Sequence, residues 1–251
     1  MDRLQICVCS FPKSGNTWLR HVIGHLFNCG PIEKFIPDMY TDVLFSEPIR
    51  TQKGEFFFYK SHSAKLNDIV NHTERKVNFV IHIRRNPLDV FCSQLNYVSK
   101  KVTGFAENNI DIPVPSAEEL KGTEELDLLF HAFCAFGTLM NNFKDAGSWF
   151  RSNTFWYNMS LQHAHIFSIR YEDLLEDPVK TLAFFEKLFG VSSKDIALAM
   201  EKAELATKID GKFYWKKSAG THKDFLNENA IRLFSKIHGA TCKHLGYDFN
   251  L

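Results

Sequence analysis

Four short, almost continuous hydrophobic runs along the chain predict buried β-strands. They cover residues 5–10, 55–61, 77–83 and 165–170. Strands that are buried on both faces of a parallel sheet carry such runs, whereas a strand with one exposed face alternates apolar and polar residues. We therefore expect these segments to form the centre of a parallel sheet.

Apolar residues spaced three and four positions apart predict helices between the strands. The predicted helices cover residues 17–27, 124–142, 147–157, 177–190, 193–206 and 229–245, and another follows Pro87. Residues 28–54, which carry several Pro and Gly residues, are expected to be irregular. Strands that alternate with helices predict an α/β three-layer sandwich with a central parallel sheet, in a single domain over residues 1–251.

Residues 100–125 are polar and contain Gly104, Pro113, Pro115 and Gly122. Long loops in compact domains commonly cover a functional site. We expect this segment to close over a bound substrate.

The composition narrows the choice of partners. The chain has 251 residues, with 30 Lys and Arg against 29 Asp and Glu, which leaves a net charge of +1. Proteins that coat nucleic acid carry a marked basic excess, so no nucleic-acid partner is expected. No apolar run approaches the roughly 20 residues of a membrane span. The start of the chain does not resemble a signal peptide, and none of the six cysteines forms a CxxC pair, so a cytoplasmic protein with reduced thiols is expected.

The strongest local signal lies between the first predicted strand and the first helix, at residues 11–18 (FPKSGNTW). A glycine turn there directs backbone N–H groups and the positive end of a helix dipole at one point, which suits a phosphate. Lys13 adds a charge, and Ser14, Asn16 and Thr17 add polar side chains. The alternative is an ordinary turn capped by Ser14 or Thr17. The order of glycine and lysine differs from the Walker A pattern of ATP and GTP sites.

This loop resembles the 5′-phosphosulfate-binding motif of the sulfotransferases that use 3′-phosphoadenosine-5′-phosphosulfate (PAPS). The family motif has Tyr where this chain has Phe11, followed by Pro, Lys, Ser or Ala, Gly15 and a Thr-Trp pair like Thr17-Trp18. The resemblance implies a P-loop-like strand-loop-helix and a role for Trp18 beside the adenine. Before the family is considered, Trp18 fits a core position equally well.

A second segment, Tyr59-Lys60-Ser61-His62, is similar to the family segment whose histidine is the general base. Side chains alternate along a strand, so Lys60 and His62 are expected on the same side at the carboxyl edge of the sheet. A histidine titrates near neutral pH and can accept a proton from an attacking hydroxyl.

A third segment, residues 80–93, resembles the 3′-phosphate-binding motif, a strand that ends in Arg-Asn-Pro with a Ser eight residues after the Arg. The match selects Arg85 and Ser93 as phosphate ligands. The guanidinium of Arg85 can bind a phosphate with two hydrogen bonds. Arg84 is expected to point to the other side of the strand end.

Two later segments extend the resemblance. Tyr171-Glu172-Asp173 is similar to the family segment whose Tyr approaches adenine, which implies that role for Tyr171, whereas Glu172 and Asp173 are interpreted as charges at a helix start. Residues 216–223 resemble a late segment that wraps the 3′-phosphate, usually Arg-Lys-Gly-x-x-Gly-Asp-Trp-Lys. Lys216 and Lys217 are the matching cations, Ser218 and His222 replace Gly and Trp, and the spacing is one residue short. The family's dimerisation signature is absent, so the oligomeric state stays open.

The resemblance implies transfer of a sulfuryl group from PAPS to a hydroxyl or amine of a small-molecule acceptor, leaving adenosine 3′,5′-bisphosphate (PAP). It implies that His62 is the base and that Lys13 and Lys60 stabilise the charge in transit, without a metal. The compact chain is similar to bacterial enzymes that tailor natural products. Two alternatives stay open: a P-loop nucleotide kinase, and an inactive PAPS- or nucleotide-binding protein of the same fold.

Overall fold

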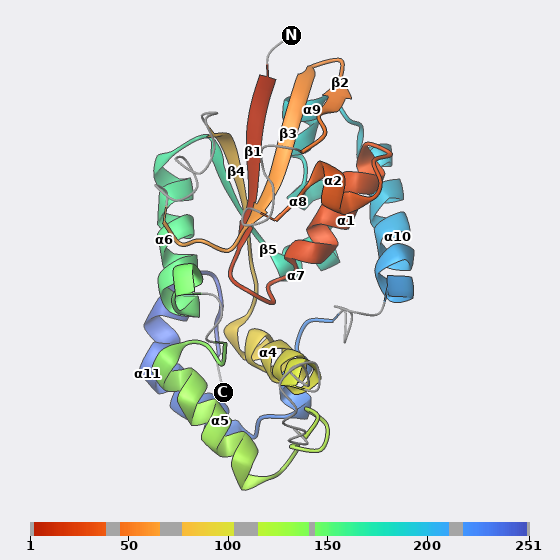
Figure 1. Cartoon of the computed structure of the whole chain (residues 1–251). Helices are drawn as coiled ribbons and strands as arrows, with labels where there is room; N and C mark the ends of the chain where they lie inside the picture. Colours follow the sequence, from red (N-terminus) through yellow and green to blue (C-terminus); the bar gives the residue numbers. More distant parts are fainter. Residues whose placement is uncertain are drawn as a thin grey trace.

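The sheet has five strands, in a computed structural model that describes residues 3–38, 46–65, 77–102, 115–140, 144–210 and 218–249. The strands are β1 (Arg3–Ser10), β2 (Ile49–Thr51), β3 (Gly54–Ser61), β4 (Val77–Arg84) and β5 (Ile166–Arg170). Their order is β2-β3-β1-β4-β5, and all pairs are parallel except β2 with β3 (Figure 1). The predicted α/β class with a central parallel sheet is confirmed, with one short antiparallel strand at its edge.

Helices cover both faces of the sheet and gather below its carboxyl edge (Figure 1). One face is covered by α1 (Asn16–Leu26), α2 (Ile32–Phe35), α8 (Pro178–Thr181), α9 (Phe184–Phe189) and α10 (Ser193–Asp210). The other face packs on α6 (Trp149–Gln162). Beyond the carboxyl edge lie α4 (Pro87–Val102), α5 (Glu124–Phe136) and α11 (Glu228–His244), around a hydrophobic cluster of their own. The short α7 (Tyr171–Glu176) directly follows β5.

Strand β1 shows why the hydrophobic runs are unbroken. Ile6 and Val8 point into the cluster under α1 and α10, whereas Cys7 and Cys9 point into the cluster that contains Trp156 of α6. Successive side chains of a strand point to opposite faces, and here both faces are buried. All six cysteines of the chain are free thiols.

Two predicted helices are shorter than the sequence pattern suggested. The helix expected over residues 177–190 is divided into α8 and α9, and α7 ends just before it at Glu176. Pro178 disfavours a helical conformation at the preceding residue, and Asp177 has φ −141° and ψ 81° and accepts a hydrogen bond from the N–H of Lys180. The helix expected to reach residue 142 ends at Phe136, because Gly137 takes the left-handed conformation that closes a helix.

Two segments expected to be irregular contain regular or packed structure. Residues 28–54 contain α2 and β2. Of the expected substrate-covering loop at 100–125, residues 103–114 lie outside the described part of the chain. Helix α4 continues to Val102, and Ala117 and Leu120 are buried in the cluster with α5 and α11. Within the described ranges, no helix is long and apolar enough to cross a membrane.

Phe189 allows a direct test of the core between α9 and the sheet. Its ring packs on Phe27, Phe56, Phe58 and Phe185, and the residue is 2% exposed. Phe189→Ala is expected to lower the free energy of unfolding by about 3–5 kcal/mol, because it removes buried apolar surface and leaves a cavity.

The matched control is Phe136→Ala on α5, where the side chain is 70% exposed. Urea denaturation should show a change within about 0.5 kcal/mol for this control. Equal losses in the two variants would contradict the assignment of Phe189 to the core.

Candidate active site

The loop after β1 begins α1 through a glycine that no other residue can replace without strain. Gly15 has φ +100°, and a Cβ atom there would lie 2.5 Å from Cδ2 of Tyr171. The carbonyl of Gly15 accepts the N–H of Leu19, which forms the first turn of α1. The loop backbone therefore lies directly on the Tyr171 ring, and the N-terminus of α1 faces the space beside it.

The polar side chains of the loop have different surroundings. The Asn16 amide donates to the Val8 carbonyl and to Ser10 Oγ, each at 3.1 Å, and so ties α1 to β1. The Ser14 hydroxyl is fully buried and has no hydrogen-bond partner among the described residues. Lys13 has φ +71°, and its Nζ lies 4.5 Å from the ring centre of Tyr97 on α4. Buried polar groups are nearly always satisfied, so an unsatisfied Ser14 hydroxyl is unusual.

His62 is joined to the loop after β1 by the register of the sheet. Ser61 pairs with Cys9 in the parallel ladder, so the next residues, His62 and Ser10, lie side by side. The Nδ1 of His62 lies 2.7 Å from the Ser10 carbonyl oxygen. Because a carbonyl only accepts hydrogen bonds, Nδ1 carries the proton and Nε2 of the neutral ring keeps its lone pair.

The surroundings of His62 favour this neutral form. Burial, and next the positive charge of Lys60, lower the pKa of His62 to about 3, although the Ser10 carbonyl and the Asp38 charge act in the opposite direction. The imidazole is therefore an unprotonated base over the whole physiological pH range.

Lys60, the second predicted residue of this segment, has an acidic partner that the sequence did not indicate. Its Nζ lies 2.5 Å from Asp38 Oδ2, and the backbone N–H of Lys60 donates to the Pro37 carbonyl. Asp38 and Lys60 also form an isolated parallel β-bridge. Asp38 comes from the segment after α2, and no spacing in the sequence linked it to β3.

Arg85 and Tyr171 meet beneath the same loop. The Arg85 guanidinium lies 4.5 Å from the Tyr171 ring centre, and it donates to the carbonyls of Lys13 at 3.5 Å and Ser218 at 3.1 Å. Its Nε is buried without a hydrogen-bond partner in the described part of the structure. The Trp149 indole donates to the Arg85 carbonyl at 3.0 Å and fixes the backbone there.

Arg84 points to the other side of the strand end, as predicted. Its guanidinium donates to the Ser168 hydroxyl and carbonyl and to the Leu245 carbonyl, and it packs on the Tyr157 ring. Ser93 lies half-buried on α4, four residues before Tyr97. Residues four apart share a face of a helix, so Ser93 lies on the face of α4 that contacts Lys13.

The interpretation of Glu172 as a helix-start charge was incomplete. Glu172 Oε1 accepts the backbone N–H of Asn86 at 2.8 Å, and Oε2 accepts the Tyr247 hydroxyl at 3.3 Å. Burial raises the pKa of Glu172, against the effect of the Asn86 hydrogen bond. This carboxyl group therefore joins α7 to the Arg-Asn-Pro turn and holds Arg85 at its position.

Trp18 is 6% exposed and belongs to the core cluster under α1, where its ring meets Tyr171 edge-to-face at 5.5 Å. Thr17 is half-buried in the first turn of α1. Lys216 and Lys217 lie outside the described residues. The loop, Lys13, Arg85, Tyr171 and Trp18 are thus connected by direct contacts.

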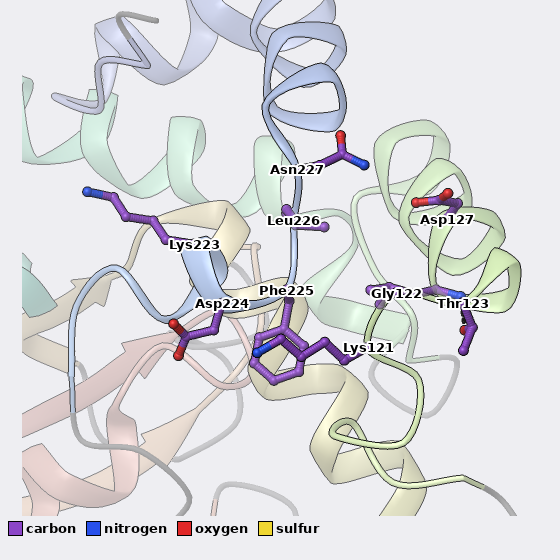
Figure 2. A pocket seen from close by; sticks show the side chains of 10 residues that line it. Lys121, Gly122, Thr123, Asp127, Lys223, Asp224, Phe225, Leu226 and Asn227 are labelled. Atoms are coloured by element: carbon purple, nitrogen blue, oxygen red, sulfur yellow. Dashed lines mark hydrogen bonds between the residues drawn. The ribbon is translucent and has the colours of Figure 1, made fainter.

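A cavity of about 300 Å³ has a different set of lining residues (Figure 2). It is bounded by the first turn of α5 and by residues 223–227, and its lining includes Lys121, Phe225 and Asn227. Lys121, Gly122 and Thr123 belong to the predicted substrate-covering loop and Lys223 to the late segment 216–223, whereas none of the predicted catalytic or nucleotide-binding residues lines this cavity.

The lowered pKa of His62 gives a prediction for the protein alone. In the folded chain the imidazole should stay neutral as the pH falls from 8 to 5, whereas an unfolded histidine titrates near 6.5. Stability from this group is fully present above pH 6.5 and is lost as the pH falls toward about 3, because the unfolded state then binds the proton more readily.

Two-dimensional NMR of the imidazole nitrogens measures the titration, and His62→Asn identifies the signals. A His62 midpoint between pH 6 and 7 would contradict this description of the site.

Solved structures of similar fold have been found. The chain resembles mouse sulfotransferase SULT7A1 complexed with PAP, with a TM-score of 0.64 and 18% identity over 96% of this chain and 84% of that one. It also resembles retinol dehydratase in complex with androsterone and PAP, with a TM-score of 0.60 and 13% identity over 98% and 82% of the chains. A second retinol dehydratase complex, with retinol and PAP, gives a TM-score of 0.57 at 13% identity over 98% and 83%. At these identities the likeness shows the fold alone.

Comparison with curated protein sequences gives no match. The family model of the sulfotransferase domain matches residues 3–246, almost the whole chain. The match includes the loop after β1, the end of β3 with His62, and the Arg-Asn-Pro turn after β4. The chain belongs to the sulfotransferase family.

Proposed function

We propose that this sulfotransferase moves a sulfuryl group from PAPS to a hydroxyl or amine of a small-molecule acceptor, with His62 as the general base. The observation that carries the proposal is the contact between three motifs distant in sequence. The Ser10 carbonyl beside His62 directly precedes the phosphate loop, and the Lys13 carbonyl in that loop accepts a hydrogen bond from Arg85.

The residues around the loop fit a nucleotide with phosphates at its 5′ and 3′ positions. The buried hydroxyl of Ser14 and the buried Nε of Arg85 have no hydrogen-bond partners in the described ranges. Backbone N–H groups at Gly15, Asn16 and Thr17, at the start of α1, suit the 5′-phosphate. Arg85 and Ser93 suit the 3′-phosphate. Trp18 and Tyr171 are proposed to border the adenine, which would contact the edges of these rings, since they are 6% and 4% exposed in the protein alone. Lys216 and Lys217 are proposed as further cations for the 3′-phosphate.

PAPS supplies an activated sulfuryl group. In the transfer, the acceptor oxygen or nitrogen forms a bond to sulfur, the bond from sulfur to the bridging oxygen breaks, and PAP leaves with that electron pair. His62 takes the acceptor proton on Nε2, the nitrogen that the Ser10 hydrogen bond leaves unprotonated. A bound anion next to the imidazole raises its pKa and makes it a stronger base.

Two lysines provide positive charge where negative charge moves. We assign Lys13 to the leaving bridging oxygen and Lys60 to the sulfuryl oxygens. Asp38 holds Lys60 in place through the 2.5 Å ion pair. Preorganised charges act strongly in a site shielded from water, because they need no rearrangement during the reaction.

The kinase alternative has weaker support. Lys13 precedes the glycine of the loop rather than following it, as the Walker A pattern requires. A thermal-shift comparison separates the two, since PAPS and PAP should stabilise the protein more than Mg-ATP. Formation of a sulfated product from a generic phenol excludes an inactive binding protein.

Replacement of the base tests the mechanism. His62→Ala should lower kcat by about 100- to 10,000-fold, because general base catalysis contributes rate enhancement of that order. The affinity for PAP should change little, since His62 acts on the acceptor. Turnover is measured with radiolabelled PAPS and a phenolic acceptor, and affinity by calorimetry.

The matched control is His131→Ala, at an exposed position on α5. It should leave both kcat and affinity at the wild-type values. A His62→Ala variant with normal turnover would exclude His62 as the base. Lys13→Ala should lower both affinity and rate, because Lys13 is assigned to both the phosphate and the leaving oxygen.

A further inference from the structure

Asp89, in the first turn of α4, is a buried carboxylate with three hydrogen bonds to one distant segment. It accepts the backbone N–H of Gly220 at 2.8 Å, the backbone N–H of His222 at 2.9 Å and the His222 Nδ1–H at 2.7 Å. Asp89 is 1% exposed and His222 is 7% exposed. Both oxygens of the carboxylate therefore bind a segment 131 to 133 residues later in the chain.

The carboxyl group of Asp89 favours its ionised form despite its burial. Burial alone raises the pKa of this carboxyl group, but the hydrogen bond from the His222 ring and the charge of Arg85 outweigh it and lower the pKa. Its place in the first turn of a 16-residue helix adds the favourable effect of the helix dipole. Removing a partner of a buried charge is strongly destabilising, so these hydrogen bonds favour the observed position of the segment.

The segment that Asp89 holds is in contact with Arg85. The Ser218 carbonyl accepts a hydrogen bond from Arg85 at 3.1 Å, and Ser218 Oγ lies 3.0 Å from Thr221 Oγ1. Gly220 takes the left-handed conformation at φ +80°, after which the chain makes the short 3₁₀ helix Thr221–Asp224. Ser218 is thus connected to Asp89 through a compact turn and directly to the guanidinium.

We infer that Asp89 and His222 form a positioning pair that orients Arg85 and the turn 218–222 for the 3′-phosphate. The inference rests on the proposed function, since it concerns the 3′ side of the same nucleotide site. The pair does not touch the reacting atoms. The Ser218 carbonyl, the Lys13 carbonyl and the Tyr171 ring hold the Arg85 guanidinium in place. Only in this orientation can Arg85 bind a phosphate with two hydrogen bonds.

The ratio of the affinity for PAP to the affinity for adenosine 5′-phosphate tests this inference. PAP and adenosine 5′-phosphate differ only in the 3′-phosphate, so their relative affinity in one protein reports on the 3′ side alone. His222→Phe keeps the ring and the backbone N–H but removes the Nδ1–H. Loss of a hydrogen bond to a charged group should lower the affinity for PAP by roughly tenfold, while the affinity for adenosine 5′-phosphate changes by less than about twofold.

Asp89→Asn is a second variant. Its amide NH₂ would face an N–H donor of Gly220 or His222, so a hydrogen bond to the segment is lost and the ratio should fall. The lost negative charge beside Arg85 would by itself favour PAP over adenosine 5′-phosphate, so a fall in the ratio in this variant cannot come from the charge change. His131→Phe on the exposed face of α5 is the matched control for His222→Phe. Calorimetry gives both dissociation constants, and melting curves confirm that the variants fold.

Each outcome has a defined meaning. A lower ratio in both variants, with the control at the wild-type value, supports the positioning pair. An unchanged ratio in His222→Phe overturns it, including the case in which both affinities fall equally, because the pair would then stabilise only the fold. A wild-type protein that binds the two nucleotides equally would instead overturn the proposed function.

Discussion

The close packing of the loop after β1 on the ring of Tyr171 is the constraint on which the site depends. A Cβ atom at position 15 would lie within 2.5 Å of the ring, so only a glycine in the left-handed conformation permits this contact. The same ring is in contact with Trp18 and lies under the guanidinium of Arg85. One aromatic side chain from α7 therefore fixes the distance between the loop of β1 and the end of β4. The parallel register of β1 and β3 then brings His62 to Ser10, the last residue of β1, directly before that loop.

The charges of the site explain how a nearly neutral protein can offer a place for a polyanion. The net charge is +1, yet Lys13, Lys60 and Arg85 gather at one edge of the sheet. In the protein alone, Lys60 is paired with Asp38, and Lys13 and Arg85 lie over tyrosine rings. Arg85 also donates to the Lys13 and Ser218 carbonyls. Contacts with rings, carbonyls and one partly exposed carboxylate are weaker than bidentate contacts with phosphate. The cations are thus oriented in advance, which limits the entropy lost when a nucleotide binds.

Much of this arrangement could be predicted from the sequence because it depends on local signals. Unbroken hydrophobic runs indicated β1, β3, β4 and β5, and the order of Gly15, Lys13 and the following helix indicated an anion site. Residues such as His62 and Arg85 stand directly after strands, so the parallel sheet places them at a common edge.

The partners of these residues could not be predicted in the same way. Asp38, Tyr97 and Glu172 act through contacts between elements that are distant in sequence, and their local patterns resemble ordinary surface or helix positions. The division of residues 177–190 into short helices was also missed, although Pro178 carried the signal. His222 and Asp89 are 133 residues apart in the sequence. His222 stands where the family segment has a tryptophan, and its ring donates a hydrogen bond to the Asp89 carboxylate. No spacing rule relates residues at that separation.

A crystal structure of the protein with PAP would test the central claim most directly, because that claim is geometric. We expect the 5′-phosphate on the N–H groups of Gly15, Asn16 and Thr17, the 3′-phosphate on Arg85, and the His62 ring on the 5′ side of the nucleotide. A nucleotide bound in the reverse direction, or in the cavity between Lys121 and Asn227, would contradict it.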